Sequence, residues 1–436
     1  MTAQNTSIDR KNKIIGITAI SSIALILVVV IVLISILSGK ATVNSNGNLM
    51  QDYNINRKTA KINEESSKDY INFCTKIMSQ QIKNGGNAAI SLTDTANTLS
   101  FLASTSYGNT RRQIENLLCQ SAEDTAAMVT GLEKRITHKD NEKYGILSSN
   151  TAWFNAAKPI AIKKSFLKNN ANRFGLNINR ENFSELSTSN LAREMVVDAT
   201  DGNSYSDVNF INENNFNIVS GATFKSLWKK GANSDDVYEN LFKGENGDST
   251  ATYFETVESK YISGETFVGT TKEYQDGFTF VGLVPKETEK DIYYTLQDVS
   301  NEIKDKNLVG NLLNSGTNAK VYVTLPYYVN SVNNPTNIDF KKTLESLGVT
   351  TVFGNSASFT EMTDDNENLR LDNYYLSGDI SITPAGAINN YSNVKTSKKE
   401  FKDCKVSVHF TRNFMYFIFD NESNLPVYFG VVNDIA

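Results

Sequence analysis

Proline, cysteine and histidine are scarce in this chain, which has 6 prolines, 3 cysteines and 2 histidines among 436 residues. An odd number of widely separated cysteines, at Cys74, Cys119 and Cys404, defines no disulfide framework. Neither His138 nor His409 stands at a spacing from other ligands that suits a metal ion. We therefore expect no metal and no cofactor, and a histidine base for catalysis would have to be one of these two residues.

An excess of positive charge is also absent. Lys and Arg number 43 against 48 Asp and Glu, which gives a net charge of -5 at pH 7. A protein that binds nucleic acid neutralises many phosphates with basic side chains, so we expect no nucleic-acid partner. Hydrophobic residues make up 40% of the chain, with 23 Phe and 19 Tyr, which is ample material for a large core.

The longest apolar run covers residues 14–37 and contains no charged residue. As a helix with a rise of about 1.5 Å per residue, it would span roughly 36 Å, enough for a hydrocarbon core of about 30 Å. Arg10, Lys11 and Lys13 precede the run and only Lys40 follows closely, which places the N-terminus in the cytoplasm. We expect an uncleaved signal-anchor in the cell membrane, with the body of the protein extracellular. A cleaved signal and a secreted protein is the alternative.

The rest of the chain divides into a polar stretch and one large body. Residues 38–66 are polar and lack periodicity, which predicts a flexible stalk. Apolar residues at helical spacing then dominate the early part of the body, and strand-like runs dominate the late part, ending in a predicted hairpin over 414–432. The pattern predicts an α+β fold with a large, mostly antiparallel sheet and further β-sheets. The expected parts are a cytoplasmic N-terminus at 1–13, a transmembrane helix at 14–37, the stalk at 38–66 and one domain at 67–436.

A long polar loop separates two apolar strands near the C-terminus. About twenty polar residues lie between Thr383 and Val406. Loops of this length inside a compact domain are more often functional or disordered than neutral. The loop is therefore the first candidate for a functional site.

Nine short patterns follow one another along the body, and together they resemble the serpin family of serine protease inhibitors. The most specific is SGATFKSLW at 220–228, which is similar to the family's N-A-x-Y-F-K-G-x-W. The resemblance covers about residues 68–432. The other patterns lie at 91–99, 108–114, 149–154, 200–202, 283–286, 323–326, 344–349 and 410–414.

The resemblance implies a mechanism in which the inhibitor does no catalysis of its own. A serpin exposes a reactive loop that a target protease cleaves, and the first half of this loop then inserts as a new strand in the large sheet. The protease is trapped before it can release itself. For this chain the resemblance implies that it is not an enzyme, that its partner is a protease, and that it is a monomer.

The resemblance also assigns candidate residues. Counting about fourteen residues forward from Gly386 gives Glu400, and counting about twelve back from Phe414 gives Lys402. Lysines near this position suit the acidic pocket of a trypsin-like serine protease. The scissile window is Lys398, Lys399, Glu400, Phe401 and Lys402. The hinge is Pro384, Ala385, Gly386, Ala387, Asn389 and Tyr391. The region that lets the sheet open is Ser91, Asp94, Asn97, Asn150 and Trp228.

The hinge departs from the family pattern of small residues. In a strand that starts at Ala387, the same face would carry Asn389 and Tyr391. Burying an unpartnered amide costs about 1–3 kcal/mol, and Pro384 is expected to remove a donor from the strand ladder. Two hypotheses remain. One is an inhibitor of a trypsin-like serine protease or of a cysteine protease; the other is a non-inhibitory, serpin-like binding or structural module.

Overall fold

The computed structural model describes residues 42–136, 144–232, 237–289, 292–329, 336–364, 369–388 and 403–435. Several predictions fall on other residues: the cytoplasmic N-terminus and the transmembrane helix, the scissile window at 398–402, and the hinge positions Asn389 and Tyr391. Within the described ranges, no helix is both long enough and apolar enough to cross a membrane.

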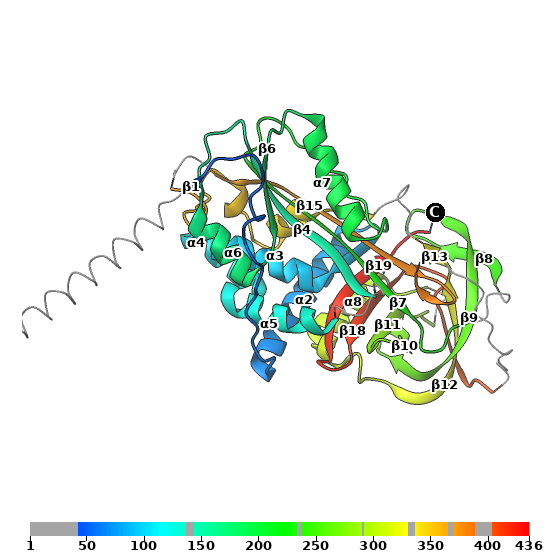
Figure 1. The fold of residues 1–436 in the computed structure, drawn as a ribbon. Helices are drawn as coiled ribbons and strands as arrows, with labels where there is room; N and C mark the ends of the chain where they lie inside the picture. Colours follow the sequence, from blue (N-terminus) through cyan, green and yellow to red (C-terminus); the bar gives the residue numbers. More distant parts are fainter. Residues whose placement is uncertain are drawn as a thin grey trace, which may run out of the picture.

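The fold is α+β, as the sequence predicts, with two large sheets and a group of helices that includes α2 to α6 on one side of the molecule (Figure 1). The first helix within the described residues, α2, begins at a capping box formed by Asn63 and Ser66 and ends at Gly85, whose positive φ of 76° suits glycine. It buries Tyr70, Phe73 and Ile77 on one face. The helices are α2 (Glu64–Asn84), α3 (Leu92–Ser104), α4 (Gly108–Leu118), α5 (Ala122–Ile136), α6 (Lys164–Arg173), α7 (Leu186–Ala199), α8 (Leu296–Asp305) and α9 (Phe340–Ser346).

The first sheet has the strand order β13-β15-β7-β4-β6-β2, with β14 paired to β15 and β16 paired to β7. Most neighbours are antiparallel, but β15 and β7 are parallel, as are β4 and β6. The sheet is therefore mixed, which the prediction of a mostly antiparallel sheet did not specify. Its strands are β2 (Gly47–Asn48), β4 (Gly145–Asn155), β6 (Asn177–Glu181), β7 (Phe216–Leu227), β13 (Tyr328–Val329), β14 (Thr336–Asp339), β15 (Leu371–Ile382) and β16 (Gly386–Ala387).

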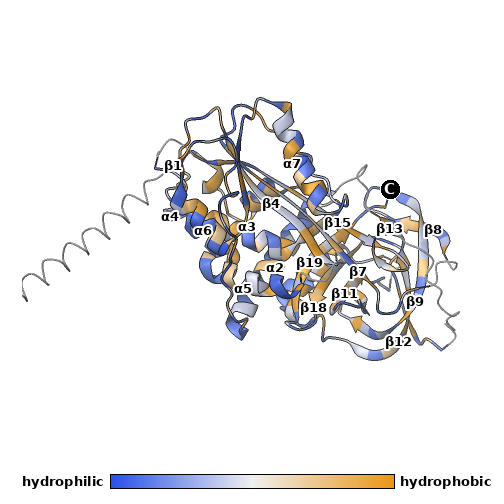
Figure 2. Cartoon of the chain, in the orientation of Figure 1, coloured by the Kyte–Doolittle hydropathy of each residue, from blue (hydrophilic) through white to orange (hydrophobic). Residues whose placement is uncertain are grey.

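The second sheet has the order β17-β12-β9-β10-β11-β18-β19-β3, and β8 pairs with β9. The hairpin predicted near the C-terminus is present, because β18 and β19 pair in antiparallel register. These strands are rich in hydrophobic residues (Figure 2). The strands are β3 (Ala88–Ser91), β8 (Tyr238–Lys243), β9 (Asp248–Ser263), β10 (Phe267–Glu273), β11 (Phe278–Pro285), β12 (Thr317–Pro326), β17 (Val406–His409), β18 (Phe414–Asp420) and β19 (Leu425–Val432).

Both faces of the first sheet are covered. Side chains alternate along its strands, so Ala152 and Ile218 face the main core while Trp153 and Val219 face the other way. Trp153 and Val219 pack with Val196 of α7 in a smaller, separate core. Helix α7 (green) therefore lies on the face of the sheet opposite α2 and α3 (Figure 1).

The predicted flexible stalk is not what the structure has at residues 42–63, which we call the N-terminal strap. Strand β1 (Thr42–Val43) pairs with β5 (Ile162–Lys163), and β2 extends the edge of the first sheet by pairing with β6. Leu49 and Met50 are buried. Farther along, the backbone N–H of Asn56 donates to Ala171 O at 3.0 Å and that of Ala60 to Ala127 O at 2.9 Å. The polar sequence predicted a flexible stalk because most contacts of the N-terminal strap are made by backbone groups, which leave no pattern in the side chains.

Candidate functional site

The predicted hinge lies at the end of β15, where the chain turns back on itself. Strand β15 pairs with β7 as far as Ile380 and Phe224. After the turn, β16 pairs antiparallel with the last part of β7, placing Gly386 opposite Leu227 and Ala387 opposite Ser226. The chain that follows the hinge thus begins a new strand at the point where β7 and β15 separate.

The turn is held by Thr383 and requires glycine at position 386. The N–H and the hydroxyl of Thr383 both donate to Gly386 O, at 3.0 and 2.8 Å. Gly386 has φ +154°, and a Cβ there would lie 2.2 Å from Ser226 O. Pro384 lies in the turn and not in β16, so the expectation that it removes a donor from a strand ladder is wrong.

Three donors hold the carbonyls of this turn, and we call them the hinge cradle. The indole Nε1–H of Trp228 donates to Thr383 O at 2.8 Å. The backbone N–H of Trp228 donates to Ala385 O at 2.8 Å, and that of Ala232 to Pro384 O at 2.8 Å. Every carbonyl from 383 to 385 therefore has a fixed donor, which leaves the hinge docked and well defined.

The cradle is itself fixed by packing. Trp228 is 1% exposed, and its ring stacks on Tyr274 with centroids 4.0 Å apart and an angle of 15° between the planes. Phe280 meets the indole edge-on at 6.0 Å. Aromatic contacts of this kind restrict the indole to one orientation, so its N–H points at the hinge.

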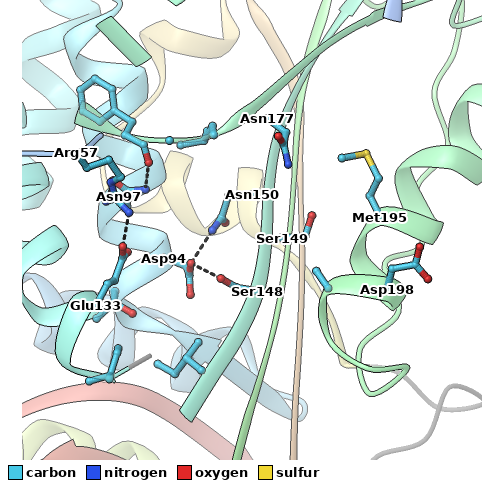
Figure 3. Close-up of a pocket in the computed structure, with 17 residues that line it drawn as sticks. Arg57, Asp94, Asn97, Glu133, Ser148, Ser149, Asn150, Asn177, Met195 and Asp198 are labelled. Atoms are coloured by element: carbon cyan, nitrogen blue, oxygen red, sulfur yellow. Dashed lines mark hydrogen bonds and ion pairs between the residues drawn. The ribbon is translucent and has the colours of Figure 1, made fainter. Parts of the chain in front are cut away.

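The other predicted sheet-opening residues lie in a polar cluster where α3 meets β4 (Figure 3). Asp94, near the start of α3, is 8% exposed. Its Oδ1 accepts from Ser148 Oγ at 2.7 Å and from Asn150 Nδ2 at 2.5 Å, and its Oδ2 accepts from Ser91 Oγ. The carboxylate thus joins the helix beneath the sheet to β4, and not to β7 or β15.

A cavity of about 550 Å³ adjoins this cluster and contains a second charged group (Figure 3). Arg57 of the N-terminal strap reaches in, pairs with Glu133 of α5 and donates to Asn97 Oδ1 at 2.8 Å. Burial raises the pKa of Glu133 to about 7, with Arg57 opposing the shift and the charge of Asp94 adding to it. Neither Arg57 nor Glu133 was predicted as a site residue, because no local sequence pattern marks either of them.

The parallel pair β7–β15 is the seam of the first sheet, and part of it carries small side chains. Ser220, Gly221 and Ala222 stand opposite Leu376, Ser377 and Gly378. Because β7 and β15 are parallel and β16 is antiparallel to β7, β16 has the direction of a strand that would be antiparallel to both. A strand that continued from the hinge along the seam would therefore run antiparallel to both β7 and β15.

The predicted site residues thus form two groups. Trp228 belongs with the hinge, through its bond to Thr383 O, and not with the polar cluster. Ser91, Asp94, Asn97 and Asn150 line or adjoin the cavity beneath β4. In the described part of the chain, no group of three or more His, Cys, Asp or Glu side chains could hold a metal ion.

Comparisons with known proteins agree with this geometry. A family model described as serpin (serine protease inhibitor) matches residues 68–435. None of the curated proteins matches the sequence significantly.

Solved structures share the fold at low sequence identity. The native state of tengpin, a thermophilic serpin, has a TM-score of 0.79 and 22% identity, covering 90% of this chain and 100% of that one. Serpin48 of the insect Tenebrio molitor has a TM-score of 0.70 and 16% identity, covering 86% of this chain and 100% of that one. Human thyroxine-binding globulin has a TM-score of 0.71 and 15% identity, covering 85% of this chain and 98% of that one. At these identities the likeness establishes the fold alone.

Proposed function

This chain belongs to the serpin family, and from that premise we propose that it inhibits a trypsin-like serine protease, or a cysteine protease, as a suicide substrate. Serpins are non-enzymatic inhibitors, so the chain itself does no catalysis. The observation that carries the proposal is the parallel seam between β7 and β15, with a docked hinge at its open end. The reactive loop is the segment after Ala387.

The proposed reaction begins when the protease attacks the loop in the window Lys398 to Lys402 and forms an acyl-enzyme. The freed loop then extends β16 along the seam and carries the bound protease with it. Each ladder bond gained on the two sides contributes about 0.5–1.5 kcal/mol net. Inhibition requires that this insertion outrun hydrolysis of the acyl-enzyme, because hydrolysis would release an active protease and a cleaved chain.

We further propose that the chain acts as a monomer at the outer face of the cell membrane. The support for this is the uncharged run at 14–37 with three basic residues before it. The first described residue, Thr42, follows this run closely, so the N-terminal strap would lie next to the membrane surface.

The test is incubation of the full-length protein, solubilised in detergent, with trypsin, followed by a denaturing gel. A covalent band at the summed mass of the two proteins is the expected result. Cleavage between Lys398 and Lys402 with trypsin still active, and no such band, would exclude inhibition of this protease class. Cleaved chain should also unfold at a markedly higher temperature than intact chain if the loop has inserted.

The second hypothesis, a non-inhibitory module, has one observation in its favour. Small residues end at Ala387, and the following positions on that face of a growing strand would be Asn389 and Tyr391. Replacing both with alanine should increase the fraction of covalent complex, because smaller side chains enter the seam faster. Equal complex formation before and after the double substitution would show that these residues do not limit insertion.

A further inference from the structure

A buried ion pair lies directly beneath the hinge cradle. Lys272 of β10 is 2% exposed, and its Nζ donates to Glu258 Oε1 at 2.6 Å and to Thr256 Oγ1 at 3.2 Å. The same Nζ donates to the backbone carbonyl of Lys230 at 3.0 Å and lies 5.1 Å from the ring centroid of Trp228. One ammonium group carried by β10 therefore contacts β9 and the segment that carries the cradle.

Stability alone does not account for this pair. Removing two charges from water costs several kcal/mol per ion in general, and apolar replacements of buried ion pairs are often neutral or stabilising. Lysine also loses much rotamer freedom when it is fixed. A pair kept in such a place is better explained by what it positions, and both of its contacts outside the second sheet lie in the segment 228–230.

The position of Lys230 explains how the pair reaches the hinge. Lys230 lies two residues after Trp228 and two before Ala232, and those two residues supply all three donors of the cradle. Holding the carbonyl of Lys230 from below restrains the backbone on both sides of it. The cation against the indole face adds a second restraint on the ring that donates to Thr383.

We propose that the Lys272–Glu258 pair is a positioning element that keeps the cradle rigid and thereby holds the hinge docked on β7 before the reactive loop is cleaved. Its consequence for inhibition rests on the function proposed above. A hinge that is already docked needs only to extend, whereas a loosened hinge must first find its place. The pair therefore favours insertion over hydrolysis of the acyl-enzyme.

The test compares two pairs of the same chemistry. The first variant is Lys272→Met with Glu258→Gln, which removes both charges together and leaves no lone buried carboxylate. The matched control is Lys229→Met with Glu273→Gln. The ion pair between Lys229 and Glu273 has the same N–O distance of 2.6 Å and lies next to Lys230 and Lys272 in the sequence. Its side chains are 63% and 56% exposed, so the control removes an exposed pair and not a buried one.

Hydrogen exchange gives a readout that needs no protease. In the full chain, we expect the Trp228 and Ala232 amides, which donate to the hinge, to exchange about three- to tenfold faster in the Lys272/Glu258 variant. The control variant should match wild type. Amides of β18, such as that of Phe417, should exchange at the wild-type rate in both, which separates local loosening of the cradle from a general loss of stability. The single variant Lys272→Arg, which keeps a cation opposite Glu258, should show slow exchange of the Trp228 and Ala232 amides, as in wild type.

The outcomes separate this inference from the proposed function. With trypsin, the Lys272/Glu258 variant should yield more cleaved chain and less covalent complex than wild type. Faster exchange at the cradle without complex formation even by wild type would leave this inference standing and reject the inhibitor. Unchanged exchange at Trp228 and Ala232 would overturn it. If the double variant does not fold, Glu258→Gln alone keeps the contact to Lys230 and should produce a smaller acceleration at the same two amides; no acceleration there would equally overturn the inference.

Discussion

The two sheets of this protein use the same backbone ladders but join their strands differently. In the second sheet, β18 is antiparallel to both of its neighbours, β11 and β19, and aromatic rings pack across these pairs. Phe280 stacks on Tyr416 at 5.6 Å, and Phe417 packs on Phe429 at 5.1 Å. At the seam of the first sheet the strands are parallel, and two consecutive pairs, Gly221–Ser377 and Ala222–Gly378, carry only glycine, alanine and serine.

The difference bears on which sheet would open in the proposed mechanism. Cross-strand pairs of large side chains contribute to the adhesion of neighbouring strands beyond their hydrogen bonds. Where both residues of a pair are small, the backbone hydrogen bonds are the main interaction that must be broken to separate β7 from β15. Gly378 also allows a close approach to β3, since a Cβ there would lie 1.7 Å from Ala89 O. In the proposed mechanism, the second sheet would therefore act as the fixed base, and the seam would be the part of the molecule that accepts a strand.

The largest effect should come from weakening the fixed base. Phe417 is fully buried between Phe419 and Phe429. Phe417→Ala should lower the free energy of unfolding by about 3–5 kcal/mol, because it leaves a cavity in a close-packed core. Urea unfolding of intact and of loop-cleaved protein should show similar losses. Tyr107→Ala, at a side chain 70% exposed, is the control and should change stability by less than about 0.5 kcal/mol.

A loss confined to the intact form would contradict the comparison, since it would mean that the second sheet takes part in opening. A small loss in both forms, below about 1 kcal/mol, would mean that the aromatic packing is not what holds that sheet together.

The next effect is at the hinge itself. Gly386→Ala places a Cβ 2.2 Å from Ser226 O at φ +154°, so the hinge cannot keep its docked position without strain. We expect a loss of about 2–4 kcal/mol, together with a smaller fraction of covalent complex. Gly354→Ala is the control, because its new Cβ would meet nothing closer than 3.7 Å. Wild-type stability and complex formation in Gly386→Ala would show that docking of the hinge is dispensable.

The sequence predicted the parts of the fold that depend on local pattern. The helical spacing of Tyr70, Phe73 and Ile77 and the alternation in the terminal hairpin were sufficient for α+β and for β18–β19. The assignment of Gly386 as the hinge glycine came from the resemblance to the serpin family, and the structure shows that a Cβ at this position would lie 2.2 Å from Ser226 O.

Contacts between distant segments could not be predicted in this way. The N-terminal strap looked like a stalk because its contacts are mostly backbone to backbone and leave no side-chain period. Arg57 meets Glu133 across 76 positions, and Lys272 meets the carbonyl of Lys230 across 42. From sequence, a lysine in a strand is expected to face solvent. The burial of Lys272 depends on Glu258 and the carbonyl of Lys230, which only the tertiary fold brings next to it.

The smallest predicted effect tests the polar side of the comparison, where the first sheet meets the helices. Glu133 faces Arg57 and lies near Asp94, and burial raises its pKa from 4.5 to about 7. Between these two values the folded protein holds a proton that the unfolded chain has released. Stability from this group is therefore fully present below about pH 4.5 and is lost as pH rises towards 7. The loss should be about 1–2 kcal/mol, because the side chain is still 19% exposed and water weakens the effect.

Unfolding in urea between pH 5 and 8 measures this slope. Glu133→Gln should remove it, so the variant should lose less stability than wild type across the range. Glu115→Gln, at a carboxylate paired with Arg111 on the helix surface, should keep the wild-type slope. If the stability of Glu133→Gln decreases with pH as steeply as that of wild type, Glu133 is ionised throughout the range. Its ion pair with Arg57 then joins the N-terminal strap to α5 at every pH tested. In that case the polar side of the sheet would be as firmly closed near pH 5 as at pH 8.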